Sequence, residues 1–235
     1  MSRPNGRLTG LIAALDTLDV ARAAAWAQAV SPHCGMVKLG LEFFLANGRA
    51  GYAAVAAPEV FLDLKLHDIP NTVAGGVRAV LPLRPRFLTL HASGGAAMIA
   101  AAREAAETAG AARPLLLAVT VLTSLDAEAL HATGVAGGPR QQVLRLARLA
   151  LAAGADGLVC SPLEVAMLRD ALGDGPVLVV PGIRPAGAAA GDQARTLTPR
   201  EAAEAGADWL VVGRPITQSA DPGAAAAAIA AEIAG

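Results

Sequence analysis

Aromatic residues and cysteines are scarce in this 235-residue sequence, and neither sign of charge dominates it. Phenylalanine, tryptophan and tyrosine make up 3% of the chain, which argues against a surface that stacks nucleic-acid bases. The formal net charge of −1 provides no overall field to attract nucleic acid or an anionic membrane. The two cysteines, Cys34 and Cys160, are far apart and form no Cys-x-x-Cys pair, so neither a disulfide framework nor a metal-binding cysteine pattern is expected.

Long hydrophobic runs are also missing, although 54% of the residues are hydrophobic. No uninterrupted apolar stretch approaches the roughly 18 residues that a membrane helix needs. Arg3 and Arg7 precede an apolar stretch, but Asp16 and Asp19 interrupt it, which is unlike a signal peptide. We therefore expect a cytoplasmic protein that binds neither membrane nor nucleic acid.

Short apolar segments alternate with longer alanine-rich segments, and this alternation predicts the fold. The predicted strands are 11–16, 36–40, 60–66, 87–91, 115–122, 157–161, 177–182 and 209–213. The predicted helices are 19–30, 41–56, 71–81, 95–110, 139–153, 162–172, 199–205 and 222–234. Near-continuous apolar strands indicate a parallel sheet, and eight strand–helix units favour a (β/α)8 TIM barrel of the α/β class, with 1–235 as a single domain. A doubly wound sheet is the alternative, but no Gly-x-Gly-x-x-Gly follows the first strand.

The segment 60–72 concentrates ionisable residues. Its leucines fall on one face of the predicted strand, whereas Asp63 and Lys65 fall on the other. Asp68 follows just past the strand end. A barrel interior holds charges only if they are paired or used. One interpretation is a buried Asp–Lys ion pair, with Asp68 capping the next helix; the other is a functional site.

Further polar residues stand at predicted strand ends, where barrel enzymes hold their functional groups. They are Asp16, Lys38, His91, Thr123, Arg184 and Arg214, in or after strands one, two, four, five, seven and eight. Each has a structural explanation of its own. Asp16 and Thr123 could be helix N-caps, and His91 could be a hydrogen-bonded core residue. Together they predict a charged barrel mouth, because unpaired buried charges cost several kcal/mol each.

The last strand is followed by Gly213-Arg214-Pro215, which predicts a phosphate site. The loops after strands seven and eight of a barrel, together with a helix N-terminus, commonly bind phosphate. Gly213 permits a close approach to the backbone, and Arg214 supplies a forked cation. The alternative is a turn with a solvated arginine.

These motifs resemble those of the orotidine 5′-phosphate decarboxylase family over nearly the whole chain. The most specific is Asp63-Leu-Lys65-Leu-His67-Asp68-Ile-Pro70-Asn71-Thr72. Five more match in the family's order: Leu15-Asp16, Val37-Lys38-Leu-Gly40, Val121-Leu-Thr123-Ser124, Pro181-Gly182-Ile183-Arg184 and Gly213-Arg214-Pro215-Ile216-Thr217. A sister group, the metal-using 3-keto-gulonate-phosphate decarboxylases and hexulose-phosphate synthases, shares Asp-x-Lys-x-x-Asp. The longer motif and Gln193 favour the pyrimidine enzymes.

The resemblance implies decarboxylation of orotidine 5′-phosphate to UMP and CO2 without cofactor or metal, by a homodimer. Lys65 would protonate C6 of the pyrimidine, and Asp63 would keep Lys65 charged. The implied catalytic set is Lys65, Asp63, Asp68 and Lys38, and Asp68 and Thr72 would reach across the subunit interface. The implied substrate-binding residues are Asp16 and Lys38 at the ribose, Thr123 at the pyrimidine edge, and Arg184, Gln193, Gly213 and Arg214 at the phosphate.

Two features leave alternatives open. Some family members have a tyrosine where this chain has Thr217, so one hydrogen bond to phosphate could be missing or differently supplied. The Gly/Ala-rich segment 185–191 is a candidate lid. The metal-dependent chemistry of the sister group and a non-catalytic barrel that only binds a nucleotide or sugar phosphate remain as alternative functions.

Overall fold

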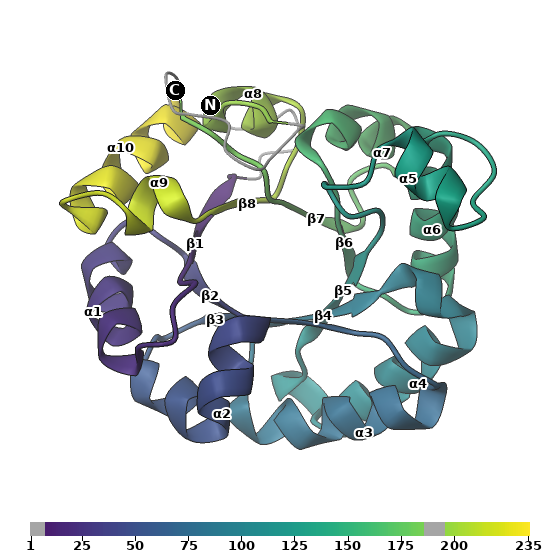
Figure 1. Cartoon of the computed structure of the whole chain (residues 1–235), viewed down its shortest axis with the longest axis horizontal. Helices are drawn as coiled ribbons and strands as arrows, with labels where there is room; N and C mark the ends of the chain where they lie inside the picture. Colours follow the sequence, from purple (N-terminus) through teal and green to yellow (C-terminus); the bar gives the residue numbers. More distant parts are fainter. Residues whose placement is uncertain (1–7, 186–195) are drawn as a thin grey trace.

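The computed structural model describes residues 8–185 and 196–235, which form a closed parallel barrel inside a ring of helices (Figure 1). The strands pair in chain order, and the eighth pairs with the first. They are β1 (Gly10–Ala14), β2 (Met36–Gly40), β3 (Val60–Leu66), β4 (Phe87–His91), β5 (Leu115–Val119), β6 (Gly157–Val159), β7 (Val177–Val180) and β8 (Trp209–Val212). The predicted (β/α)8 barrel is confirmed, and the doubly wound alternative is wrong.

The α-helices cover the outside of the barrel. They are α1 (Val20–Val30), α2 (Leu41–Val55), α3 (Pro70–Val80), α4 (Gly95–Glu107), α5 (Ala127–Ala132), α6 (Pro139–Ala152), α7 (Val165–Leu172), α8 (Pro199–Glu204), α9 (Arg214–Thr217) and α10 (Pro222–Ala234). The sequence predicted all of these except α5 and α9, which have six and four residues. Within the described ranges, no helix is long and apolar enough to cross a bilayer.

Successive residues of each strand face the barrel interior and the helix layer in turn. An interior apolar cluster contains Ile12, Ala14, Met36, Phe61, Phe87, Leu117, Val179 and Val211. Lys38 lies two residues after Met36 in β2, and Asp63 lies two residues after Phe61 in β3, so both face the barrel interior as well. The apolar cluster therefore forms a floor beneath the polar residues at the C-terminal ends of the strands.

Several strands end earlier than predicted, which changes the setting of two candidate residues. Asp16 and Thr123 lie in the loops after β1 and β5 and do not close those strands. Neither begins a helix: Asp19 caps α1 by accepting from the Arg22 N–H at 3.0 Å, and Asp126 caps α5. The side chains of Asp16 and Thr123 are thus not used as N-caps.

Ion pairs at the opposite, N-terminal end of the barrel join the strands to the helices. Asp208, just before β8, accepts from Arg169 Nη2 at 2.6 Å and from the Leu178 N–H at 2.7 Å. Arg169 also donates to the carbonyl oxygens of Gly206, Pro176 and Gly173. Both side chains of the pair are about nine-tenths buried. This arginine therefore satisfies a carboxylate and three backbone carbonyls at once.

We expect Arg169→Ala to lower the free energy of unfolding by about 3 kcal/mol, because it leaves a buried carboxylate without its cation. Urea unfolding followed by circular dichroism measures the change. Arg148→Ala, which removes an exposed arginine of α6, should stay within about 0.5 kcal/mol of the wild type. Equal stability of the two variants would contradict a structural role for Arg169.

Candidate active site

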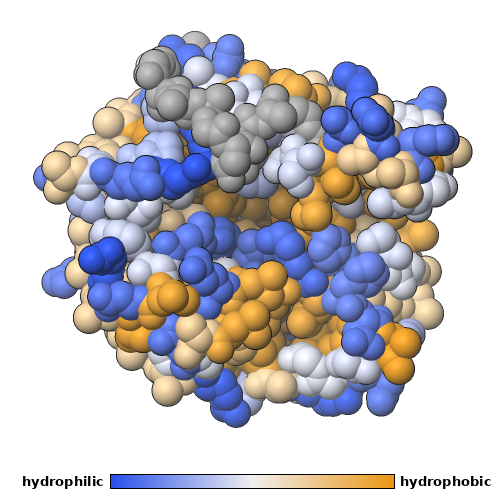
Figure 2. Space-filling model, in the orientation of Figure 1, coloured by the Kyte–Doolittle hydropathy of each residue, from blue (hydrophilic) through white to orange (hydrophobic). Residues whose placement is uncertain are grey.

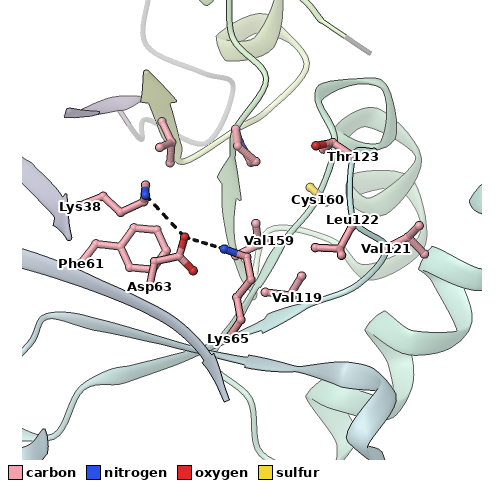
Figure 3. Close-up of a pocket in the computed structure, with 12 residues that line it drawn as sticks. Lys38, Phe61, Asp63, Lys65, Val119, Val121, Leu122, Thr123, Val159 and Cys160 are labelled. Carbon is pink, nitrogen blue, oxygen red and sulfur yellow. Dashed lines mark hydrogen bonds and ion pairs between the residues drawn. The ribbon is translucent and has the colours of Figure 1, made fainter. Parts of the chain in front are cut away.

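Four charged side chains of alternating sign form a row across the barrel mouth. Lys38 Nζ lies 3.0 Å from Asp16 Oδ1 and 3.7 Å from Asp63 Oδ2. Lys65 Nζ lies 2.8 Å from the same Asp63 oxygen. In Figure 3 the two ammonium groups approach this carboxylate from two sides. The structure therefore brings together four residues that the sequence singled out.

Asp63 is the buried centre of this row, with a relative exposure of 7%. Burial by itself would raise the pKa of its carboxyl, but the charges of Lys38 and Lys65 and hydrogen bonds from Lys65 and Thr89 outweigh burial and hold the pKa below its usual range. Asp63 is thus an anion at neutral pH. Its negative charge stabilises two ammonium groups in a site partly shielded from water.

The strand geometry at Lys65 is irregular, which the alternating sequence pattern did not predict. Lys65 has a positive φ of 48°, in the left-handed region. The β3–β4 register shifts between Leu62 and Leu66, as in a β-bulge. Bulges beside functional sites redirect side chains, and here the Lys65 amine meets Asp63, two residues earlier in the same strand.

A small cavity of about 190 Å³ opens beside Lys65, with a mainly apolar wall. It is lined by Lys38, Phe61, Asp63, Lys65, Val119, Val121, Leu122, Thr123, Val159, Cys160, Pro181 and Val211. The charged groups occupy one side of it in Figure 3, while Thr123 and the aliphatic side chains occupy the other. Such a cavity suits a flat, partly polar ring that presents one reactive atom to the lysine.

A larger cavity of about 670 Å³ adjoins the first, and Lys38, Pro181 and Val211 line both. Its other lining residues are Ala14, Asp16, Arg22, Trp26, Gly182, Arg184, Gly213, Arg214, Thr217 and Gln218. Figure 2 shows this face of the molecule hollowed near its centre, with hydrophilic residues along the hollow. The two cavities together form a continuous site with an apolar end and a cationic end.

Two arginines make the larger cavity suitable for an anion. Burial, followed by the charge of Arg214, lowers the pKa of Arg184, so the two cations repel one another across a partly buried space. Gly213 stands beside them, and an added Cβ would lie 3.6 Å from Ala14 Cβ, an ordinary contact. Gly213 also lines the cavity, and without a side chain it leaves its backbone open to a ligand.

Asp68 and Thr72 are not part of the charged row. All of residues 67–72 are exposed, and Ile69 is 67% exposed. Asp68 Oδ1 accepts from the Ile69 N–H at 2.7 Å, and no ion pair joins Asp68 to another residue of the described ranges. Asp68 does not cap α3, because the N-cap is Ile69 and Pro70 begins the helix. The capping interpretation of Asp68 is therefore wrong.

Some candidate residues lie outside the described ranges, and the sequence analysis missed some residues of the site. Gln193 and most of the candidate lid 185–191 lie outside the described residues. Sequence reasoning missed Arg22 and Trp26 of α1, which line the larger cavity. The guanidinium carbon of Arg22 lies 5.9 Å from the centroid of the Trp26 ring. Their four-residue spacing on a helix was a usable signal. It also missed Thr89, which no motif marked.

Comparison with known proteins agrees with this geometry. A model of the orotidine 5′-phosphate decarboxylase / HUMPS family matches residues 9–229. The chain is 60% identical over 232 residues to an orotidine 5′-phosphate decarboxylase of Gluconobacter oxydans (strain 621H), covering 97% of this chain and 98% of the relative. It is 57% identical to that of Anaeromyxobacter sp. (strain K), covering 95% and 97%.

A solved structure, of orotidine 5′-phosphate decarboxylase from Lactobacillus acidophilus, superposes on this barrel with a TM-score of 0.86 and 39% sequence identity. The match covers 97% of this chain and all of that one. Because both the family model and these relatives extend over almost the full length, the chain belongs to the orotidine 5′-phosphate decarboxylase family.

Proposed function

We propose that this protein converts orotidine 5′-phosphate to UMP and CO2, in pyrimidine biosynthesis, without a metal or an organic cofactor. The observation that carries the proposal is the Lys38–Asp63–Lys65 cluster, set between a ring-sized cavity and a cavity with two arginines. The membership in the family and the names of the relatives support this substrate.

The reaction breaks the bond between C6 of the pyrimidine and its carboxylate, and the electron pair stays on C6. No π system receives that pair, so a nearby cation is the obvious stabiliser. Lys65 supplies it: its ammonium stabilises the developing carbanion and then transfers a proton to C6, which forms the C–H bond of UMP. Water reprotonates the amine after product release. Asp63 keeps Lys65 charged and oriented and lies beside the departing carboxylate.

The remaining site residues hold the nucleotide. Asp16 and Lys38 bind the ribose hydroxyls, and Thr123 contacts the pyrimidine edge. The phosphate is bound by Gly213, Arg214 and Arg184, together with Gln193. Contacts with the phosphate, which is far from C6, provide binding energy that helps to orient the pyrimidine ring at Lys65.

Turnover in the presence of chelator tests this function. We expect undiminished conversion of orotidine 5′-phosphate to UMP in EDTA, because the Lys65 ammonium supplies the cation at the reacting carbon and the Asp63 carboxylate is already paired with Lys38 and Lys65. Loss of all turnover on chelation, restored by Mg²⁺, would indicate the metal-dependent chemistry of the sister group. Nucleotide binding without CO2 release would indicate a non-catalytic barrel.

The exposed segment 67–72 supports the further proposal of a homodimer with shared sites. Ile69 leaves a large apolar side chain in solvent beside Asp68 and Thr72. In the dimer, Asp68 and Thr72 would enter the partner's site and extend the alternating row of charges by one carboxylate.

Mixed subunits test this sharing. Lys65→Ala and Asp68→Ala subunits, each inactive alone, should regain about a quarter of wild-type activity when mixed, because half of the randomly formed dimers have one intact site. Two wild-type preparations treated in the same way provide the control. If mixing restores nothing although mass spectrometry shows heterodimers, Asp68 acts within its own chain, and the proposal of shared sites is wrong.

A further inference from the structure

Thr89 occupies a special place in the barrel interior. It is fully buried, at 0% exposure, in the middle of β4. The β3–β4 register pairs Leu62 with Leu88 and Leu66 with Leu90, so three residues of β3, 63–65, stand opposite this one residue of β4. Those three residues include both Asp63 and Lys65.

The Thr89 hydroxyl bonds to both of these neighbours. Its Oγ1 donates to Asp63 Oδ1 at 2.8 Å and accepts from the Lys65 backbone N–H at 2.8 Å. A hydroxyl has one donor and can also accept, so a single group satisfies a carboxylate oxygen and an amide hydrogen. Among uncharged side chains of this size, serine can do the same, whereas valine, of equal shape, can do neither.

The bond to the Lys65 N–H matters because of the backbone conformation there. The positive φ of 48° is unfavourable for a residue with a side chain and persists only where the surroundings hold it. The bulge interrupts the β3–β4 ladder at Lys65, and the Thr89 hydroxyl accepts the amide hydrogen in place of a ladder carbonyl. An unsatisfied N–H in this partly buried position would favour another backbone conformation.

We propose that Thr89 is a positioning residue of the active site, which fixes the bulge at Lys65 and the orientation of the Asp63 carboxylate. The catalytic part of this inference rests on the proposed function. Asp63 Oδ1 is held by Thr89, which leaves Oδ2 facing the ammonium groups of Lys38 and Lys65. One hydroxyl thereby sets both the backbone from which the lysine side chain extends and the anion that it meets.

The composition of the chain allows a direct measurement. Only two of the 19 lysines and arginines are lysines, Lys38 and Lys65. Protein labelled with ¹⁵N-lysine therefore gives two backbone amide signals. In Thr89→Val, we expect the Lys65 amide to exchange with solvent about tenfold faster or more, because its acceptor is lost. The Lys38 amide should keep its wild-type rate.

Two further variants control the experiment. Thr89→Ser retains the hydroxyl and should retain the wild-type Lys65 exchange rate. Thr120→Val removes another buried threonine hydroxyl, which donates to the Val159 carbonyl at 3.1 Å, and should leave Lys65 exchange unchanged. If Thr89→Val fails to fold, Thr89→Ala provides the same comparison.

Kinetics provide the second readout. Thr89→Val should lower kcat about 10- to 100-fold, while the Kd for UMP stays within about threefold of the wild type, since the change misplaces the reacting lysine and leaves the phosphate grip intact. Thr89→Ser should recover most of the kcat. The acid limb of the pH–rate profile should move to higher pH in Thr89→Val, because Asp63 loses a hydrogen bond that lowers its pKa.

The inference is overturned if Thr89→Val keeps both the Lys65 exchange rate and the kcat of the wild type, or if Thr89→Ser is as impaired as Thr89→Val. Faster Lys65 exchange in Thr120→Val would indicate general loosening and would also contradict it. If the wild type has no turnover with orotidine 5′-phosphate, the proposed function fails. The exchange rates then still decide whether Thr89 holds the bulge.

Discussion

Lys65→Ala should lower the turnover of orotidine 5′-phosphate by a factor of at least about 10⁴, because in the proposed mechanism it removes both the cation that stabilises the carbanion and the proton that quenches it. The affinity for UMP should change by less than about tenfold, since the residues proposed to bind phosphate and ribose line the other cavity. Steady-state kinetics and isothermal titration calorimetry measure the two quantities separately.

A matched variant separates charge from proton transfer. Lys65→Arg keeps a positive charge but offers a guanidinium that does not give up a proton near neutral pH. We expect it to be nearly as inactive as Lys65→Ala. Near-normal turnover by the alanine variant would remove Lys65 from the mechanism, and strong activity of the arginine variant would assign it an electrostatic role alone.

Asp63→Asn should lower kcat about 100- to 1,000-fold, because the neutral amide cannot form the ion pair that orients the Lys65 ammonium. Its effect on substrate binding is a separate question. If the Asp63 carboxylate repels the substrate's carboxylate in the ground state, the variant should bind orotidine 5′-phosphate more tightly while binding UMP unchanged. A kcat within tenfold of the wild type would contradict the role of Asp63.

The same substitution should alter the pH dependence of stability. The pKa of Asp63 is lower in the folded state than in the unfolded chain, where it is about 3.9. The carboxylate therefore stabilises the fold above that pH, and the contribution is lost as the pH falls through the lower, folded-state pKa. In Asp63→Asn, the free energy of unfolding should fall less steeply below about pH 4. Urea titrations at several pH values measure it.

The barrel itself was predictable, because parallel strands that are buried on both faces have near-continuous apolar sequences. Strand β3 follows this rule on one face and departs from it on the other. Its leucines pack toward the helices, whereas the charged residue Asp63 points to the barrel interior. A charged residue at an interior position is visible in the sequence. So is the Gly213-Arg214 pair that follows the last strand.

The details of the site could not be predicted, since they depend on tertiary contacts between strands. An alternating pattern gives no sign that Lys65 adopts a positive φ. Thr89 looks like any β-branched strand residue until its neighbour across the sheet is known. The helix caps show the same limit: Asp16 was a candidate N-cap, but Asp19 caps α1 by accepting from the Arg22 N–H.

In the proposed mechanism, an ammonium group at position 65, beside Asp63, performs the chemistry. Chemical rescue of Lys65→Cys tests it most directly. Alkylation with 2-bromoethylamine rebuilds an amine of nearly the lysine length, whereas iodoacetamide adds a neutral amide. The native thiols are poor competitors, because burial raises the pKa of Cys34 to about 12 and also raises that of Cys160.

We predict that Lys65→Cys is inactive, that aminoethylation restores a substantial part of the turnover, and that the neutral amide restores none. Mass spectrometry of the intact protein verifies that both reagents have reacted to the same extent. Full aminoethylation without any return of UMP formation, or equal return with the neutral amide, would contradict the account.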